Sequence, residues 1–393
     1  MNRIQQLKTS DYDEIFELSQ FAFQYKLSTE DMQKKKEEAD RHIIWGYMDD
    51  EKIAAKLHLI PLTTYINGKE FKMGGISSVA TWPEYRRQGM AKHLMYHALQ
   101  YMKKEGYTIT FLHPFSFAFY RQYGFEHTFS LKRYIIPAEK MSGRWQGNGY
   151  VRRSGLDIPL LNSIYADYAK QFTGTIHRDE KWWKERSFKQ VDQIAVAYND
   201  DHKPEGYIHY YVKNNELVVK ELAYKTINGW QLLLEFVANH DSMVETIKMT
   251  VPESDYLTEF AHEPDFKQWI EPYFMARIVD VATFLSEYSF VEAVTDHESV
   301  TLLVDDPFLP ENKGIYRLTQ RGSKVSVVQE EYKSVDESSI VCTIQQLTMI
   351  VLGYKRPLEL YHLGLIGGCE NEINRLERWI PVQKTYYTLV DFF

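Results

Sequence analysis

The feature that most constrains the fold of this chain is a short basic turn, RRQGMA at residues 86–91, set between an extended and a helical segment. Residues 72–81 before it are predicted to form a strand, and apolar residues recur at helical spacing over residues 90–104 after it. The backbone N–H groups of a helix's first turn have no partner within the helix and lie at the positive end of its dipole. Because Gly89 lets the backbone approach a ligand closely and the two arginines can bind phosphate, the turn predicts an anion-binding site in an α/β fold.

At 393 residues the chain is too long for one ordinary core, and we predict three domains. Residues 1–149 form an α/β unit, and residues 150–283 repeat its β-β-β-α-β plan without visible sequence repetition. Residues 284–393 place strands before helices, which is typical of an α+β domain. The predicted fold class is therefore α/β and α+β, with two tandem units of a mixed sheet flanked by helices and a third α+β domain.

The individual elements are predicted from hydrophobic periodicity and from turn signals such as Asn67-Gly68. Strands are expected at residues 3–7, 42–48, 53–60, 63–66, 72–81, 107–112, 193–198, 206–212, 216–224, 245–251, 299–304, 314–320 and 324–331. Helices are expected at residues 11–23, 29–41, 90–104, 158–170, 179–186, 229–239, 343–352, 357–363 and 371–379, and a further short helix is expected between the strand at 107–112 and Tyr123. The segment VRRSGLD (151–157) imitates the basic turn but precedes the strands of its unit, so we expect a linker there.

The composition restricts the partners and the compartment. A formal net charge of −8 argues against a dedicated nucleic-acid binder. The two cysteines, Cys342 and Cys369, exclude a disulfide scaffold and a zinc site of the usual spacing, so we expect no metal. The sequence has no apolar run of about eighteen residues and no apolar core of a signal peptide near Met1, so we expect a cytoplasmic protein without a membrane span.

A second motif gives the basic turn its context. A predicted buried strand at 107–112 leads to the segment FYRQYGF at residues 119–125. Together with the Arg-x-x-Gly-x-Ala turn, this arrangement resembles the GCN5-related N-acetyltransferase (GNAT) superfamily. A dinucleotide-binding fold is the rival phosphate binder, but no Gly-x-Gly-x-x-Gly follows a strand in this sequence.

The resemblance implies a site for acetyl-CoA. The strand before the turn would pair with the pantetheine arm, the turn would hold the pyrophosphate, and the loop after the next strand would lie near the thiol. The residues it assigns to the cofactor are Val79, Ala80, Thr81, Arg86, Arg87, Gln88, Gly89, Met90, Ala91, Lys92, Phe115 and Ser116.

Over its whole length the chain resembles the Eis-type (enhanced intracellular survival) acetyltransferases, with a GNAT unit, a degenerate second copy and an α+β tail. The tail is similar to a sterol carrier protein domain on the segments YFMARIVDVATFL (273–285) and LGYKRPLELYHLGLIGG (352–368). The resemblance implies that Tyr120 is the general acid and that the C-terminal carboxylate, on Phe393, is the base. It also implies a hexamer that acetylates several amines of an aminoglycoside-like or polyamine substrate.

These two roles fit the chemistry of acetyl transfer from a thioester to an amine. The amine must lose a proton, and the departing thiolate needs a proton or a hydrogen bond. A phenol, with a pKa of about 10, suits the role of proton donor. A hydrated terminal carboxylate, with a pKa of about 3.5, is a poor base. It becomes a better one if desolvation raises its pKa, and it can also act through a water molecule that relays the proton. The resemblance, with which this chemistry agrees, therefore implies an acetyl-CoA-dependent N-acetyltransferase acting by direct transfer on a primary amine of a small cationic substrate.

Other functions stay open. The acceptor could be a lysine of a protein or peptide, and tandem GNAT units also occur in aminoacyl-tRNA-dependent peptide transferases, which the net acidity and the intact turn disfavour. A non-enzymatic acyl-CoA- and lipid-binding protein is a further alternative. Asp11, Glu126 and Asp391 could attract a cationic acceptor but cannot be ranked from sequence, and His93 and His97 are expected to be ordinary helix positions.

Overall fold

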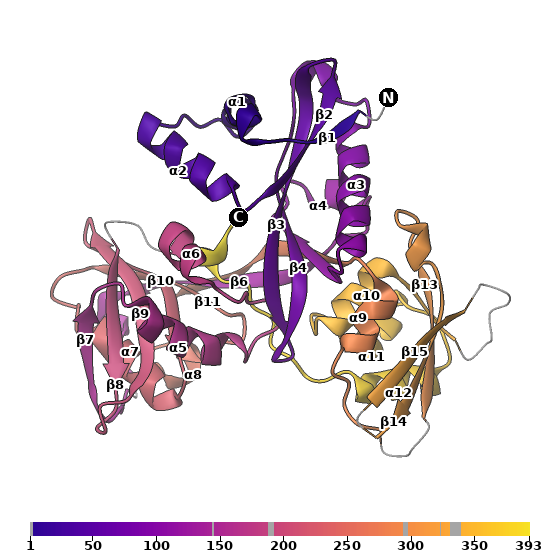
Figure 1. Cartoon of the computed structure of the whole chain (residues 1–393). Coiled ribbons are helices and arrows are strands. Elements are labelled where there is room, and N and C mark those ends of the chain that lie inside the picture. Colours follow the sequence, from indigo (N-terminus) through magenta and orange to yellow (C-terminus); the bar gives the residue numbers. More distant parts are fainter. Residues whose placement is uncertain (1–2, 144, 188–191, 294–297, 323, 331–338) are drawn as a thin grey trace.

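The computed structural model describes residues 3–143, 145–187, 192–293, 298–322, 324–330 and 339–393. The ribbon forms three lobes, which we call the N-terminal unit (3–140), the middle unit (150–278) and the C-terminal unit (281–379) (Figure 1). A tail, residues 380–393, leaves the C-terminal unit and ends beside the strands of the N-terminal unit. The end of the chain thus returns from the C-terminal unit to the N-terminal unit.

The N-terminal unit has the strands and helices that the sequence predicts, with one additional strand at its end. Ser28 caps a helix by accepting a hydrogen bond from the backbone N–H of Asp31, and Asn67 and Gly68 form a hairpin turn with φ of 49° and 76°. Its strands are β1 (Ile4–Gln6), β2 (Ile43–Asp49), β3 (Lys52–Ile66), β4 (Lys69–Thr81), β5 (Ile109–Leu112) and β6 (Glu126–Pro137), and its helices are α1 (Tyr12–Phe23), α2 (Thr29–Ala39), α3 (Met90–Lys104) and α4 (Phe117–Arg121).

The middle unit repeats this order of elements. Its helices begin at capping residues such as Asp157 and Thr226, whose side chains accept the hydrogen bonds of first-turn N–H groups. Its strands are β7 (Tyr150–Ser154), β8 (Gln193–Tyr198), β9 (Pro204–Lys213), β10 (Glu216–Tyr224), β11 (Thr246–Val251) and β12 (Lys267–Ile278), and its helices are α5 (Ile158–Ala169), α6 (Glu180–Trp182, continued by a π-helical turn over Trp183–Ser187), α7 (Ile227–Ala238) and α8 (Leu257–Phe260).

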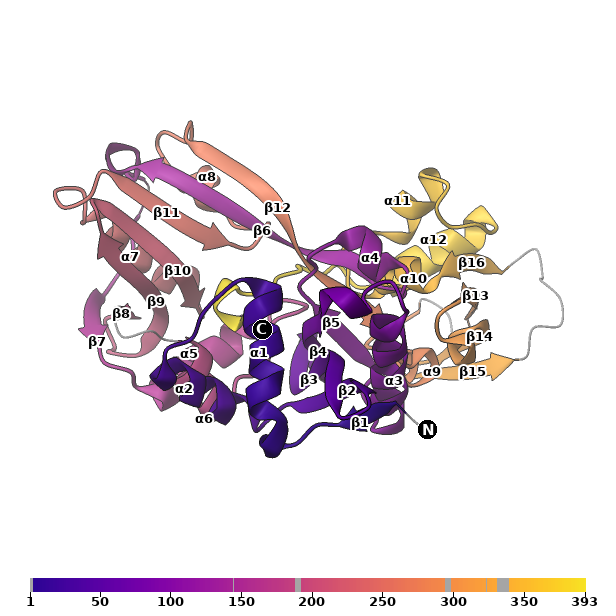
Figure 2. The same ribbon diagram turned by 90° about the horizontal axis from the view of Figure 1, so that it is seen from above.

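The two units share one twelve-stranded sheet in which each gives its last strand to the other. The strand order is β1-β2-β3-β4-β5-β12-β6-β11-β10-β9-β8-β7. Thus β5 of the N-terminal unit pairs with β12 of the middle unit, and β11 of the middle unit pairs with β6 of the N-terminal unit. The exchanged strands β6 and β12 also pair with each other and run side by side between the two lobes (Figure 2). This exchange makes the two copies one continuous body.

The C-terminal unit is a four-stranded sheet packed with helices, as expected for an α+β domain. Its strand order is β15-β14-β13-β16. Its elements are α9 (Val281–Glu287), β13 (Ser299–Asp305), β14 (Gly314–Arg321), β15 (Lys324–Glu330), β16 (Ile340–Thr343), α10 (Ile344–Val351), α11 (Pro357–His362) and α12 (Glu370–Trp379), and short 3-10 turns lie at Thr9–Asp11, Pro83–Tyr85, Ala138–Lys140, Pro310–Asn312 and Leu389–Asp391. None of the helices in the described ranges combines the length and hydropathy needed to cross a bilayer.

The structure corrects the sequence prediction at three places. Residues 53–60 and 63–66 belong to the single strand β3. The last residue of β3 that pairs with β2 is Leu59, and Pro61 lies beyond it. The missing N–H of Pro61 therefore leaves no gap in the pairing of β3 with β2. The segment at 151–157 is not a linker, since β7 pairs with β8 at the sheet edge. The strands β6 and β12 are additional to the prediction.

The tail is held by a buried ion-pair network centred on Arg178. Arg178 is fully buried and donates to Glu221 of β10 (Nη2 to Oε1, 2.5 Å) and to Asp391 of the tail (Nε to Oδ1, 2.8 Å). Asp391 also accepts hydrogen bonds from the indole N–H of Trp182 (2.8 Å) and from the hydroxyl of Tyr165 (3.2 Å). The middle unit therefore fixes the last residues of the chain.

We predict that Asp391→Asn lowers the free energy of unfolding by about 3–5 kcal/mol, the usual cost of breaking a buried ion pair. The amide nitrogen of asparagine would face the N–H and O–H donors that now point at the carboxylate. Denaturant titration followed by tryptophan fluorescence measures the change, since Trp182 contacts the mutated side chain. Glu30→Gln, which removes an exposed ion pair with Lys34, is the control and should cost less than about 1 kcal/mol. Equal effects of the two changes would contradict the assignment.

Candidate active site

The centre of the N-terminal unit is an opening between β4 and β5. The two strands pair in parallel only over residues 73–76 and 109–112, whereas β4 continues to Thr81. The register of β3 against β4 slips between Lys56 and His58, and Ser78 has a φ of 51°, in the left-handed region. Beyond this bulge, residues 79–81 turn one edge of their backbone to the opening. Unpaired N–H and C=O groups of this kind can bind an extended ligand as an added strand.

The basic turn lies at the end of β4 and leads directly into α3. Gly89 caps the helix with a φ of 78°, and Arg87 has a φ of 63°. A Cβ atom on Gly89 would have room, its nearest neighbour being His93 Cε1 at 3.7 Å, so the left-handed backbone rather than space favours glycine here. Arg86 and Arg87 are both exposed. The turn therefore presents two guanidinium groups and the positive end of α3 to the surface.

These elements line a cavity of about 630 Å³, which we call the turn cleft. The predicted cofactor residues that line it are Val79, Ala80, Thr81, Arg86, Arg87, Gly89, Met90, Ala91, Lys92 and Phe115. The side chain of Gln88 instead donates to the Glu84 carbonyl oxygen (3.2 Å), and Ser116 caps α4 by accepting from the Phe119 N–H (3.3 Å). The structure thus brings together all the predicted cofactor residues except these two.

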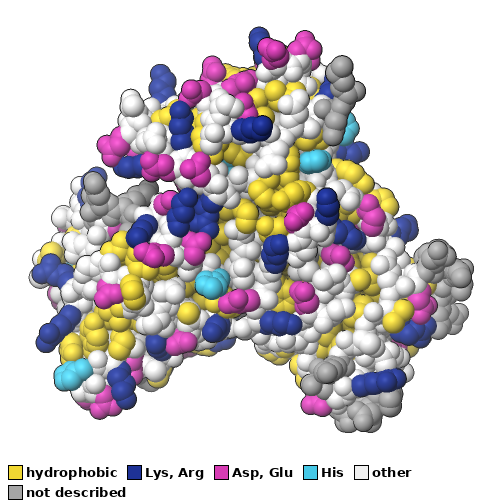
Figure 3. Space-filling model, in the orientation of Figure 1, with side chains coloured by type: hydrophobic (Ala, Val, Ile, Leu, Met, Phe, Trp, Pro, Cys, Tyr) yellow, Lys and Arg dark blue, Asp and Glu magenta, His cyan; other side chains and the backbone are white. Residues whose placement is uncertain are grey.

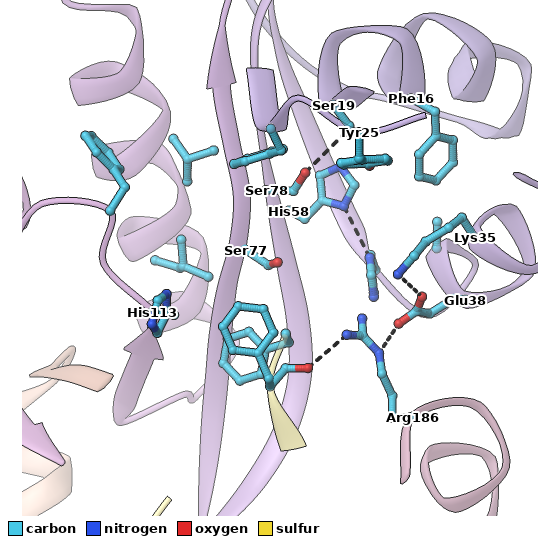
Figure 4. A pocket seen from close by; sticks show the side chains of 18 of the residues that line it. Phe16, Ser19, Tyr25, Lys35, Glu38, His58, Ser77, Ser78, His113 and Arg186 are labelled. Carbon is cyan, nitrogen blue, oxygen red and sulfur yellow. Dashed lines mark hydrogen bonds and ion pairs between the residues drawn. The ribbon is translucent and has the colours of Figure 1, made fainter. Parts of the chain in front are cut away.

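A second cavity of about 510 Å³ adjoins the turn cleft, and we call it the tail cavity because the last two residues of the chain line it. Phe23, Val79 and Phe115 line both cavities, so the two meet at these residues. Tyr120 and Phe393, the two predicted catalytic residues, both line the tail cavity. Figure 4 shows this cavity between β4, with Ser77 and Ser78, and Arg186 of the middle unit.

Tyr120 lies on α4 in a cluster of aromatic rings. Its ring centroid is 5.6 Å from that of Phe115 and 6.1 Å from that of Phe125, and the residue is 4% exposed. Burial raises the pKa of the Tyr120 phenol well above its ordinary value. The hydroxyl therefore keeps its proton at neutral pH and can donate it only to a base stronger than water, such as a thiolate.

The C-terminus is positioned by contacts from the N-terminal and middle units. The Phe393 ring covers Gly75 of β4, where an added Cβ atom would come within 2.8 Å of the ring, and packs edge-on against Phe274 of β12 (5.3 Å). The carbonyl oxygen of Phe392 accepts a hydrogen bond from Arg186 Nη1 (3.0 Å). Gly75 is thus required so that the tail can approach β4 closely.

Three basic side chains form a cluster at the tail cavity, with His42 and His58 in its lining and Lys56 behind them. Lys56 is fully buried, and its ammonium group lies 2.7 Å from Ser78 Oγ and 3.2 Å from His58 Nε2. His58 Nδ1 in turn lies 3.2 Å from His42 Nδ1. Burial lowers the pKa of Lys56 to about 7 and that of His42 to about 3, and that of His58 falls well below its usual value.

The acidic residues proposed from sequence do not face the tail cavity. Asp11 accepts from the Lys8 N–H at the start of the chain, Glu126 pairs with Arg121 (2.7 Å), and Asp391 is buried against Arg178. Glu38 is the acidic side chain in the lining, and it pairs with Lys35 (2.8 Å) and with Arg186.

The structure adds Lys56, His58, Arg178 and Arg186 to the residues that shape the site, and sequence analysis missed them. Lys56 and His58 interrupt the apolar run of β3 on alternate positions, and this pattern is the one available signal for a polar group facing inward. Arg178 and Arg186 act across units, so their spacing in sequence carries no signal.

The histidines of α3 take structural positions. His97 packs edge-on against Trp45 (5.2 Å) and His93 stacks on Tyr47 (5.9 Å). Within the described part of the chain, no group of three or more His, Cys, Asp and Glu side chains is placed to hold a metal ion.

Comparison with protein families assigns each part of the chain. Residues 3–128 and 174–278 match two models of an acetyltransferase (GNAT) domain, and residues 281–388 match that of a sterol carrier protein domain. The chain therefore belongs to the GNAT acyltransferases, with two GNAT domains followed by a sterol carrier protein domain. This confirms the family and the fold class predicted from the sequence, while the domain boundaries and the site residues stay predictions.

Individual relatives agree with this assignment. An uncharacterized N-acetyltransferase of Streptomyces griseus is 25% identical over 132 residues, which are 32% of each chain, so this chain spans about a third of the length of the curated relatives it matches. Among solved structures, a conserved protein of unknown function and probable N-acyltransferase from Enterococcus faecalis has a TM-score of 0.92 with 25% identity, over 100% of this chain and 99% of that one. Eis1 from Mycobacterium abscessus has a TM-score of 0.81 with 17% identity, over 99% and 100%, so its fold is shared.

We predict that Lys56→Met makes the protein more stable at pH 7 by about 2 kcal/mol, the cost of burying the lysine less the hydrogen bonds lost. Because the folded state lowers the pKa of Lys56 to about 7, the unfolded state binds more protons above that pH, and wild-type stability should rise between pH 7 and about 10.5. The variant should lose this rise. Urea titrations at several pH values measure it, and identical pH profiles would contradict the burial of the ammonium.

Proposed function

We propose that this chain transfers an acetyl group from acetyl-CoA directly to a primary amine of a small molecule. The observation that carries the proposal is the meeting of two cavities, one lined by the basic turn and one by Tyr120 and Phe393, at Phe23, Val79 and Phe115. A thioester at this junction would be reached by its carrier from one side and by an amine from the other. Membership of the GNAT acyltransferases supports the same reaction.

The turn cleft fits acetyl-CoA as the acetyl donor. The exposed Arg86 and Arg87 and the N-terminus of α3 suit the pyrophosphate, and the backbone edge at residues 79–81, beyond the part of β4 that pairs with β5, suits the amides of pantetheine. These residues bind and orient the donor, and they take no part in the making or breaking of bonds.

Two groups of this chain move protons in the proposed reaction. The amine nitrogen forms a bond to the thioester carbonyl carbon, the carbon–sulfur bond breaks, and the Tyr120 hydroxyl gives its proton to the departing sulfur. The terminal carboxylate of Phe393 accepts the proton that the amine loses. A carboxylate becomes more basic where it is removed from water, and such a site at the chain end would suit it to this role.

The identity of the acceptor is the finer part of the proposal. The family resemblance favours aminoglycoside-like or polyamine acceptors over the lysine of a protein or peptide, and the volume of the tail cavity, about 510 Å³, suits a small molecule. A hexamer and a cytoplasmic location belong to the same set of predictions. Light scattering of the purified protein tests the assembly.

We predict that Tyr120→Phe lowers kcat by about 10²–10⁴-fold, because the thiolate then leaves without a proton donor. The KM for acetyl-CoA should stay within a few-fold, since the phenol hydroxyl does not hold the cofactor. Thiol release measured over a panel of amines gives both constants. Tyr96→Phe, on the exposed side of α3, is the control and should keep the wild-type rate. An unchanged kcat in Tyr120→Phe would remove its role as the acid.

We predict that blocking the terminal carboxylate has a similar effect. A C-terminal carboxamide, made by protein ligation, removes the charge of Phe393 without adding bulk and should lower kcat by about 10²-fold or more at neutral pH. One added residue should act in the same way, and thermal unfolding checks that both forms stay folded. Wild-type turnover by the carboxamide form would show that the carboxylate is not the base.

A further inference from the structure

The charges that line the tail cavity are unusual for a site expected to hold a polycation. The lining includes Lys35 and Arg186 and the single acidic side chain Glu38, which pairs with both of them. Figure 4 shows these three side chains on one wall of the cavity. Lys56 lies directly behind the opposite wall. With the terminal carboxylate proposed above for Phe393 included, three positive groups (Lys35, Lys56 and Arg186) stand against two negative ones (Glu38 and that carboxylate) in and behind the cavity.

Lys56 belongs to a network of hydrogen bonds that, among the described residues, has one donor without an acceptor and no carboxylate paired with the lysine. Its ammonium group reaches Ser78 Oγ (2.7 Å), the Ser78 carbonyl oxygen (3.0 Å) and His58 Nε2 (3.2 Å), which accounts for all of its N–H groups. Over the described residues, no carboxylate pairs with it. A buried ammonium without an opposite charge is costly, and buried charges are normally paired.

The direction of each hydrogen bond in this network can be traced from the lysine outward. As an ammonium, Lys56 is a donor only, so His58 Nε2 accepts and His58 carries its proton on Nδ1. His58 Nδ1 then donates to His42 Nδ1, which leaves the proton of His42 on Nε2. His42 Nε2 is buried and has no hydrogen-bond partner among the described residues, although His42 lines the tail cavity. The network therefore ends in one unused N–H donor, which is buried on a side chain that lines the cavity.

The serine branch of the network, in contrast, is complete. Ser78 Oγ accepts from Lys56 and lies 3.3 Å from Ser19 Oγ, whose own hydroxyl donates to the Ile15 carbonyl oxygen (3.1 Å). Ser78 can thus donate to Ser19, and that branch continues to the backbone of α1 and to Tyr25, which lines the tail cavity. Among the described residues of this network, the His42 N–H is the donor left without a hydrogen-bond partner.

We propose that the acceptor amine of this enzyme carries a carboxylate, and that this carboxylate binds in the tail cavity at His42 Nε2, with Lys56 as its buried counter-charge. The proposal rests on the proposed acetyl transfer and names the class of its acceptor: an amino acid rather than a polycation. A ligand carboxylate would accept from the open N–H and supply the charge that the Lys56 network lacks. A polyamine or aminoglycoside would instead bring further positive charge to Lys35, Arg186 and Lys56.

The other residues that line the tail cavity indicate which kind of group lies between the amine and the carboxylate of the acceptor. The aromatic residues that line the cavity are Phe16, Phe23, Tyr25, Phe115, Tyr120, Phe392 and Phe393. Rings of this number favour an apolar or aromatic group between the amine and the carboxylate end.

Two pairs of amines that differ only by a carboxylate test the proposal. L-phenylalanine is compared with phenethylamine, and 6-aminohexanoate with pentylamine, which separates the two charged ends further; spermidine represents the polycations. With acetyl-CoA in excess, thiol release and the mass of the acetylated product give kcat/KM for each. We expect at least one pair to favour the carboxylate by about 10- to 100-fold, the value of a hydrogen bond to a charged group, and spermidine to be the poorer substrate. If neither pair shows a preference, or spermidine is the best acceptor, the proposal is overturned.

Variants of Lys56 and His42 test whether the preference for a carboxylate arises from their hydrogen-bond network. Lys56→Met and His42→Phe should each bring the ratio within the preferred pair down toward one, which a general loss of activity would not do. Lys34→Met, an exposed lysine of α2 paired with Glu30, changes the same charge outside the cavity and should keep the ratio. A ratio that survives both network variants places the carboxylate elsewhere and overturns the assignment.

Binding separates a failure of this proposal from a failure of the proposed function. Calorimetry with N-acetyl-L-phenylalanine and N-acetylphenethylamine measures the carboxylate preference without turnover. If none of the amines is acetylated, the proposed function fails, while tighter binding of the N-acetyl amino acid would still support the carboxylate site. Equal binding of the two compounds, together with turnover of amines that ignores the carboxylate, would leave acetyl transfer standing and remove the acceptor class.

Discussion

The ion pairs of Arg178 with Glu221 and Asp391 are the interaction on which the geometry of the site depends. They are fully buried, so each group needs its partners to offset the loss of water. Arg178 and Glu221 belong to the middle unit and Asp391 to the tail that follows the C-terminal unit, while Phe393 two residues later lines a cavity of the N-terminal unit. One buried guanidinium thus fixes the end of the chain against strands that begin it. A surface ion pair could not set this register, because solvent and side-chain entropy would leave it loose.

An irregularity in one strand of the same site, the bulge at Ser78, lies at both the opening and the buried basic cluster. The bulge at Ser78 interrupts the pairing of β3 with β4, which resumes at Lys56 and Ala80, and it brings Lys56 under the Ser78 backbone. The pairing of β4 with β5 ends just before it, at Ile76. The opening for a donor and the buried basic cluster therefore meet at one distortion. On the outer face drawn in Figure 3, basic and acidic side chains are interspersed, so the chain's net charge of −8 gives no guide to the charge of this cavity.

How much could be predicted from the sequence follows from the range of the interactions involved. The basic turn, the helix after it and the Asn67-Gly68 hairpin are local, and the structure has them where periodicity and capping place them. The exchange of β6 and β12 is not local: either strand could pair with its own unit or with the other, and the residues of both suit the two positions. Arg178 shows the same limit, because the partners of a buried charge 213 residues away in sequence leave no pattern near it. The assignment of Tyr120 and Phe393 came from family resemblance, and the bulge that places Lys56 near them had no signal beyond alternating polar residues in an apolar strand.

The middle unit explains why two copies of one fold need only one donor site. In the N-terminal copy, the first turn of α3 is open and flanked by arginines. In the middle copy, the corresponding end of α7 is closed by Glu205, whose carboxylate accepts from Thr226 Oγ1 (2.8 Å) and Asn228 Nδ2 (2.7 Å), and Gly229 lies so close to Glu205 that an added Cβ would meet its carbonyl oxygen at 2.6 Å. An internal carboxylate thus takes the position that an anionic ligand would need. This copy instead supplies Arg178 and Arg186, which hold the tail, so one copy carries the turn cleft and the other fixes the chain end beside it.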